Sequence, residues 1–204
     1  NAALILGVAG ATADADIILL SGLAGLLAGA FSMAAGEYVS VRSQRELYEY
    51  QIEQERAELE QYPEEEAEEL ALILSARGLP IEQARRTAAA LFKDPEQALR
   101  SLSIEELGVN PDELGSPWIA ASSSLLSFAL GAALPLSPFV ISSDPGALIA
   151  TVIISAIGLF AVGSAVSTFS GRSALIGGLR MLAIGAAAGL ATFAVGRALG
   201  ITLA

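Results

Sequence analysis

The chain has 204 residues, of which 22 are acidic and 11 basic, and it contains no cysteine and no histidine. Hydrophobic residues make up 53% of it, which is at the upper edge of the range for soluble domains. This composition excludes disulfides, thiolate or imidazole metal sites, and catalysis by a histidine base. We therefore expect no enzyme, and any bound metal ion would need oxygen ligands.

The charge is concentrated in one part of the chain. Residues 42–114 hold 18 acidic and 8 basic side chains, a net of −10, whereas the whole chain has a net charge of −11. The remainder is nearly uncharged. This distribution predicts an all-α polytopic membrane protein with one acidic helical insert. The sign of the insert's charge disfavours nucleic-acid binding.

The uncharged segments predict five transmembrane helices. Residues 1–13 are fewer than the roughly 20 that a bilayer requires, so we interpret them as the end of a first helix that starts earlier. Four longer runs follow at 17–36, 118–141, 147–170 and 173–196, the last interrupted only by Arg180. Pro135 and Pro138 are interpreted as the terminus of the third span. Residues 142–146 are predicted to form a tight turn.

The second span carries two features beyond its apolar character. Gly25 and Gly29 form a GxxxG pattern, which lets another helix approach closely and suggests dimerisation through this face. Met33 and Glu37 follow on one face, four residues apart. An acidic residue near the end of a membrane helix is costly and indicates function. The alternative is simple exposure of Glu37 at the membrane edge.

The insert is predicted to consist of short helices. No helix breaker separates Glu37 from Tyr62, so the second span should continue as the insert's first helix. Further helices are predicted from Pro63, over 81–92, and from Asp94, which should act as an N-cap. The segment 103–106, Ser-Ile-Glu-Glu, repeats the capping pattern. Glu106 would then simply cap a helix.

Four glutamates form two closely spaced pairs on either side of Pro63. Glu55 and Glu58 are three residues apart, as are Glu66 and Glu69. Side chains at this spacing share one face of a helix. Two such pairs on two helices could close around one cation. The alternative interpretation is a solvated acidic face, which is the usual role of a charge run.

The arginines predict which side of the membrane the insert occupies. Arg42, Arg45 and Arg56 flank it, and Arg172 lies in the turn between the last two spans. The positive-inside rule places the insert and this turn in the cytoplasm. The predicted domains are residues 1–41 with the first two spans, 42–116 as the acidic cytoplasmic domain, and 117–204 with the last three spans.

Four stretches together resemble the vacuolar iron transporter family, in a prokaryotic-type member. They are Ser-Met-Ala-Ala-Gly-Glu-Tyr-Val-Ser-Val-Arg-Ser at 32–43, the acidic run at 62–74, Glu-Glu-Leu-Gly-Val at 105–109, and Gly-Gly-Leu-Arg at 177–180. The likeness covers nearly the whole chain. It implies a homodimer that exports Fe²⁺ or Mn²⁺ from the cytoplasm in exchange for protons. It implies no cofactor besides the transported ion.

The resemblance also assigns roles to individual residues. The family's metal-binding glutamates match Glu55, Glu58, Glu66, Glu69 and Glu106, and the methionine of its translocation path matches Met33. Glu37 is placed to pass an ion or a proton between the insert and the membrane path. The family's first-span acidic residue would precede Asn1, and a methionine of the plant insert corresponds to Leu102.

Two expectations concern context. We expect an integral protein of a bacterial inner membrane, surrounded by lipid. The alternative function is a non-transporting membrane scaffold or metal sensor whose acidic insert binds a partner protein.

Overall fold

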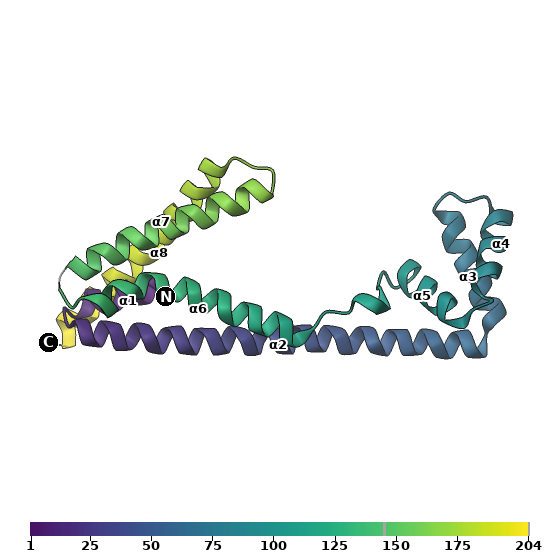
Figure 1. Ribbon diagram of the computed structural model, residues 1–204, viewed down its shortest axis with the longest axis horizontal. Helices are drawn as coiled ribbons and strands as arrows, with labels where there is room; N and C mark the ends of the chain where they lie inside the picture. Colours follow the sequence, from purple (N-terminus) through teal and green to yellow (C-terminus); the bar gives the residue numbers. More distant parts are fainter. Residues whose placement is uncertain (145, 204) are drawn as a thin grey trace. The chain divides into compact units, whose positions relative to one another are not determined.

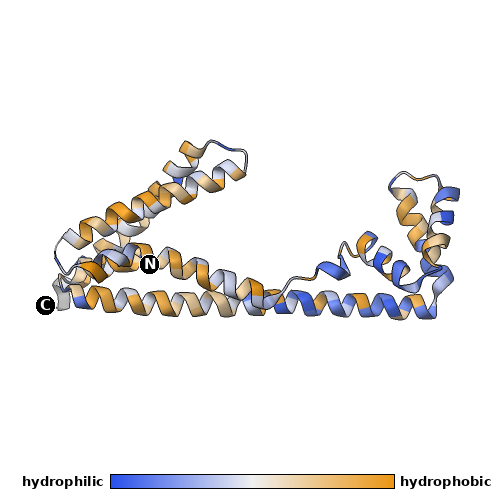
Figure 2. Cartoon of the chain, viewed as in Figure 1, coloured by the Kyte–Doolittle hydropathy of each residue, from blue (hydrophilic) through white to orange (hydrophobic). Residues whose placement is uncertain are grey.

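The computed structural model describes residues 1–144 and 146–203 (Figure 1). Within these ranges the chain is built from helices and short turns and contains no β-strand, which confirms the all-α class. The chain forms two compact units. We call them the apolar unit, Asn1–Ala35 with Ala121–Ala204, and the polar unit, Gly36–Ala120. Figure 2 shows the contrast in hydropathy between the helices of the two units.

Four helices are long and apolar enough to cross a membrane. They are α2 (Ala15–Gln61), α6 (Pro117–Ile141), α7 (Gly146–Phe169) and α8 (Ala174–Leu203). Large apolar side chains such as Leu20, Ile141 and Phe169 are exposed on them, as lipid contact requires. The chain is therefore an integral membrane protein. The residues predicted to be the end of the first span form the short apolar helix α1 (Ala2–Ala11). That first span, and with it the total of five, stays a prediction.

Close backbone contacts hold α1 against α8. A Cβ atom added at Gly10 would overlap the carbonyl oxygen of Phe193, and one added at Gly196 would overlap the carbonyl oxygen of Gly7. In lipid, helices gain little from the hydrophobic effect between them, so contact of this kind is a main source of association. Close backbone contact also joins α7 to α8, where Gly163 and Gly177 face each other.

The glycines of the second span face helices of the same chain. Side chains at Gly25 and Gly29 would meet Leu4 of α1 and Phe128 of α6, respectively. The close helix approach that the GxxxG pattern predicted is thus made within one protomer. Dimerisation through this face stays a prediction, as does the homodimer itself.

The two prolines of α6 lie inside the helix, so their interpretation as a helix terminus is wrong. Pro138 has no N–H to donate to the carbonyl oxygen of Leu134, and the Ser137 hydroxyl donates to that oxygen instead at 2.8 Å, while the helix continues to Ile141. Thr151 of α7 also donates to the carbonyl oxygen of Pro135, at 2.9 Å. The predicted 142–146 turn includes residue 145, which is outside the described residues.

The polar unit contains the second half of α2 and four short elements. These are α3 (Pro63–Ala76), α4 (Ile81–Leu91), α5 (Pro95–Glu105) and the 3₁₀ turn η1 (Pro111–Glu113). Helices α3 and α4 pack side by side, joined by a turn in which Gly78 has a φ of +108°, a conformation that favours glycine. Their core consists of Leu70, Ala71, Ala84 and Ala88, with Leu102 of α5.

Two capping predictions for α5 had different outcomes. Asp94 is its N-cap and accepts a hydrogen bond from the backbone N–H of Glu96, as predicted. The second cap, at Ser103, is wrong. Ser103 is fully buried inside α5 and donates to the carbonyl oxygen of Leu99, so no new helix starts there. Glu106 instead follows the last residue of α5 as its C-cap.

The α1–α8 contact predicts opposite effects for two glycine substitutions. Gly196→Ala places a methyl group against the Gly7 backbone, and should lower the free energy of unfolding by about 1–3 kcal/mol. Gly131→Ala is the control, because no atom of the described residues lies within 4 Å of its added Cβ. It should keep or raise stability by up to about 1 kcal/mol. Thermal unfolding in detergent measures both, and equal effects would contradict the assigned contact.

Candidate metal centre

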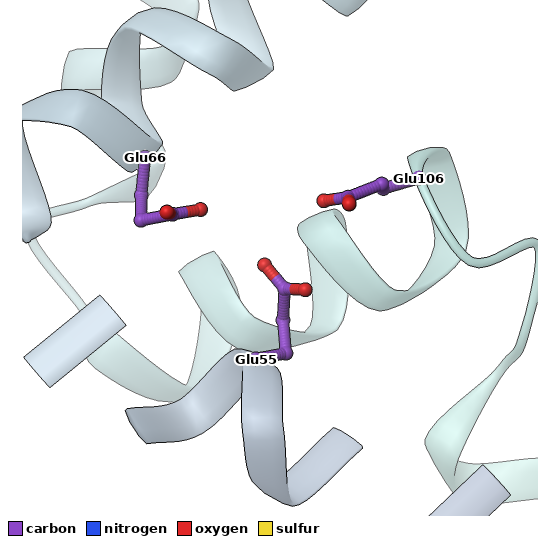
Figure 3. A group of neighbouring side chains, drawn as sticks. All are labelled: Glu55, Glu66 and Glu106. Atoms are coloured by element: carbon purple, nitrogen blue, oxygen red, sulfur yellow. The ribbon is translucent and has the colours of Figure 1, made fainter. Parts of the chain in front are cut away.

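Three glutamates from three helices meet in the polar unit. Glu55 lies in α2, Glu66 in the first turn of α3, and Glu106 at the C-cap of α5. Each offers a carboxylate oxygen, and these oxygens all lie within 4.8 Å of one another. Figure 3 shows the three side chains pointing toward a common point.

The local sequence explains how these residues converge. Pro63 cannot continue α2, because it lacks a backbone N–H, but it suits the first position of α3. The chain therefore changes direction between Glu55 and Glu66. Leu102, one turn before Glu106, is fully buried in the core that α3 and α4 share, and this anchors the end of α5.

The three carboxylates lack a basic partner. Glu55 and Glu66 are only 4% and 7% exposed, whereas Glu106 is exposed. None of the ion pairs within the described ranges involves any of the three. One oxygen of Glu55, Oε1, is buried without a hydrogen-bond partner. A buried carboxylate in this state is costly when ionised, so it favours a proton or a cation.

Burial and mutual repulsion raise the pKa of all three carboxyl groups. Burial is the main cause for Glu55, followed by the charges of Glu106 and Glu66, and its pKa rises to about 7. Burial also raises the pKa of Glu66 and of Glu106, with further contributions from neighbouring glutamates. A hydrogen bond between Glu55 and Glu66 opposes the rise in the pKa of Glu66. The group therefore takes up a proton near neutral pH more readily than ordinary glutamates.

The other two glutamates of the predicted pairs lie outside the group of three. Glu58 and Glu69 are exposed, but their charges contribute to the raised pKa of Glu106 and Glu66. The structure thus joins one member of each pair with Glu106, where the sequence predicted that the two pairs would close on each other. A binding role for Glu58 and Glu69 stays a prediction.

The remaining predicted residues do not join this group. Glu37 is exposed on α2, and Met33 belongs to the apolar unit and is 47% exposed. Their predicted roles in translocation remain predictions. Arg77, to which no sequence pattern assigned a role, contacts Glu105 next to Glu106. No local pattern reveals this contact, because its partners are 28 positions apart.

The arrangement fits a divalent cation with oxygen ligands. Such ions bind protein oxygens at about 2.0–2.6 Å, so oxygens up to 4.8 Å apart can share one ion placed between them. The donor set contains no sulfur or nitrogen, which suits hard or borderline ions. Bound metal would also compete with the proton that Glu55, with its pKa of about 7, takes up near neutral pH.

Comparison with known proteins agrees with this picture. The model of the VIT family matches residues 1–197. The chain is 32% identical over 196 residues to vacuolar iron transporter 1 of Arabidopsis thaliana, covering 96% of this chain and 78% of that protein. It is 37% identical over 188 residues to the vacuolar iron transporter of Acanthamoeba castellanii, covering 88% and 68%, respectively. It is 30% identical over 197 residues to vacuolar iron transporter 2 of Oryza sativa subsp. japonica, covering 96% and 80%. This chain of membrane helices and clustered carboxylates belongs to the VIT family.

Proposed function

We propose that the protein moves Fe²⁺ or Mn²⁺ out of the cytoplasm in exchange for protons, and that the polar unit first captures the ion. The observation that carries the proposal is the meeting of Glu55, Glu66 and Glu106, none of which forms an ion pair with a described basic residue. A solvated acidic face does not bury two carboxylates together, whereas a cation site does. The names of the relatives, as vacuolar iron transporters, support iron as the cargo.

Proton exchange follows from competition for the same oxygens. Because the pKa of Glu55 is about 7, this carboxyl group is about half protonated at neutral pH. Binding of a divalent ion displaces the proton, and renewed protonation favours release of the ion. A proton gradient across the membrane then supplies the free energy for directional transport.

Selection among metals is assigned to the membrane path. The capture site offers oxygen atoms alone, which also suit Mg²⁺ and Ca²⁺. The thioether of Met33 is a softer ligand that favours Fe²⁺ over these two ions. Glu37, one turn further along α2, is suited to transfer an ion or a proton between the capture site and this path.

The orientation and assembly complete the proposal. By the positive-inside rule, Arg42, Arg45 and Arg172 favour the cytoplasmic side of the membrane for the polar unit. The functional form is a homodimer in a bacterial inner membrane. A scaffold or metal sensor is the alternative, and it would bind metal without moving it.

Metal uptake by proteoliposomes tests the capture site directly. We expect the full chain to transport Fe²⁺ or Mn²⁺, and Glu55→Gln to lower the apparent affinity at least about tenfold by removing one anionic ligand. Glu65→Gln is the matched control, because it removes the same charge from an exposed position beside Glu66. It should change affinity less than about twofold.

Two outcomes would count against this assignment. Equal losses in the Glu55 and Glu65 variants would reduce the cluster to a general acidic surface. Metal binding without flux in the wild-type protein would favour the sensor.

The thioether of Met33 is tested by Met33→Leu. This change conserves apolar volume, so folding stability should change by less than about 1.5 kcal/mol. We expect metal binding to the polar unit to persist while Fe²⁺ flux falls about tenfold or more, because only the sulfur ligand is lost. Undiminished Fe²⁺ flux would show that Met33 has a packing role only.

The raised pKa of Glu55 predicts the pH dependence of metal binding. Protons compete with the metal below the pKa of about 7, so affinity should increase as the pH rises through this value. If one proton is released, lowering the pH from about 8 to about 6 should weaken Mn²⁺ binding about tenfold. In Glu55→Gln the affinity should be lower and its change over this range smaller. Titration calorimetry in detergent measures both, and a flat wild-type profile would contradict the assigned proton competition.

A further inference from the structure

Arg77 binds the residue that immediately precedes Glu106. It is the C-cap residue of α3, and its Nη2 donates a hydrogen bond to the backbone carbonyl oxygen of Glu105 at 2.9 Å. Its Nη1 forms an ion pair with the Glu105 carboxylate. One guanidinium therefore holds both the backbone and the side chain of Glu105, a geometry to which the planar fork of arginine is well suited.

Glu106 is the least constrained of the three clustered glutamates. Glu55 lies within α2 and Glu66 in the first turn of α3, whereas Glu106 follows the last residue of α5. Its backbone N–H bonds to the carbonyl oxygen of Leu102, and two residues later the chain turns at Gly108, with a φ of +68°. Helix ends of this kind tend to fray unless other groups hold them.

The Arg77 contact supplies such a constraint. It ties the C-terminal end of α3 to the C-terminal end of α5, so it links the helix that carries Glu66 with the one that presents Glu106. It satisfies a carbonyl group in the last turn of α5 and places positive charge where the helix dipole favours it. It also pairs Glu105, which keeps that carboxylate away from the neighbouring cluster.

We propose that Arg77 is a positioning residue for the capture site. By clamping Glu105, it holds the Glu106 carboxylate within reach of an ion bound by Glu55 and Glu66. This inference rests on the proposed metal-binding function. Groups that orient metal ligands typically contribute 10–100-fold to metal affinity, which sets the expected size of the effect at about tenfold or more.

The charge of Arg77 and its positioning role have opposite effects on metal affinity. A positive side chain near a cation site opposes cation binding, so removing the charge of Arg77 should strengthen binding if charge were its only influence. Loss of positioning acts in the opposite direction. A weaker site in Arg77→Gln therefore cannot be attributed to the change in net charge.

The chain offers a matched control. Arg85 of α4 forms a forked pair with Glu68 of α3, with three N–O distances of 2.7–3.2 Å. Like Arg77, it is about half exposed and joins two helices of the polar unit. Neither Arg85 nor Glu68 belongs to the group of three carboxylates. Arg85→Gln thus repeats the charge change and the loss of a helix–helix ion pair without touching the segment that carries Glu106.

The experiment measures Mn²⁺ binding by titration calorimetry on the full chain in detergent, at one pH above 7 and one salt concentration. We expect Arg77→Gln to weaken binding about tenfold or more, and Arg85→Gln to change it less than about twofold. Arg77→Lys should recover a measurable part of the loss, because an ammonium group can still pair with Glu105 but lacks the fork. Thermal unfolding of the metal-free proteins should be similar for the two Gln variants.

The outcomes separate this inference from the function on which it rests. If the wild-type protein binds no Mn²⁺, the proposed capture function fails. If the wild-type protein binds Mn²⁺ and Arg77→Gln binds it equally or more tightly, the positioning role is overturned while the capture function stands. Equal weakening in Arg77→Gln and Arg85→Gln, or no recovery in Arg77→Lys, would also overturn it.

Discussion

Repulsion among clustered carboxylates, two of them buried, is the constraint on which the polar unit depends. Glu55, Glu66 and the exposed Glu106 share one location, and no ion pair within the described residues involves them, so their ionised forms oppose folding. Packing of Leu70, Ala84 and Leu102 and pairs such as Arg85–Glu68 must offset this cost. A protein optimised only for stability would not retain such a cluster. The cost becomes useful when a cation relieves it, because relief of repulsion then contributes to binding.

The apolar unit solves a different problem. Its helices carry apolar side chains on nearly every face, including the exposed ones. In lipid, burying such side chains between helices contributes less to association than it does in water. Contacts at Gly7, Gly163 and Gly196 instead bring backbones together. Ser137 donates to the Leu134 carbonyl oxygen that Pro138 leaves without a backbone donor, which helps α6 continue past its prolines in a medium that offers no water. The two units thus use separate means of stabilisation.

Much of the fold could be predicted because its signals are local. Uncharged runs predict the long membrane helices, Pro63 predicts the reversal after α2, and Asp94 predicts the start of α5. The failures occur where distant residues decide. Ser103 resembles an N-cap by spacing, but burial against the α3–α4 core keeps it inside α5. Helical spacing likewise paired Glu55 with Glu58 and contains no information about Glu106, which was predicted only through the family resemblance.

The value that the raised pKa of Glu55 reaches matters as much as the direction of the shift. A carboxylate with an ordinary pKa would be ionised throughout the physiological range, and protons would then be ineffective competitors for a bound metal. A fully enclosed cluster would hold its protons so strongly that a metal ion could not displace them. The cluster lies between these two extremes. Glu55 is buried and has a pKa of about 7, whereas Glu106 is exposed and gives the cluster access to solvent. In the proposed exchange of metal for protons, this intermediate burial would let either one displace the other, whereas a permanent metal store would favour the metal alone.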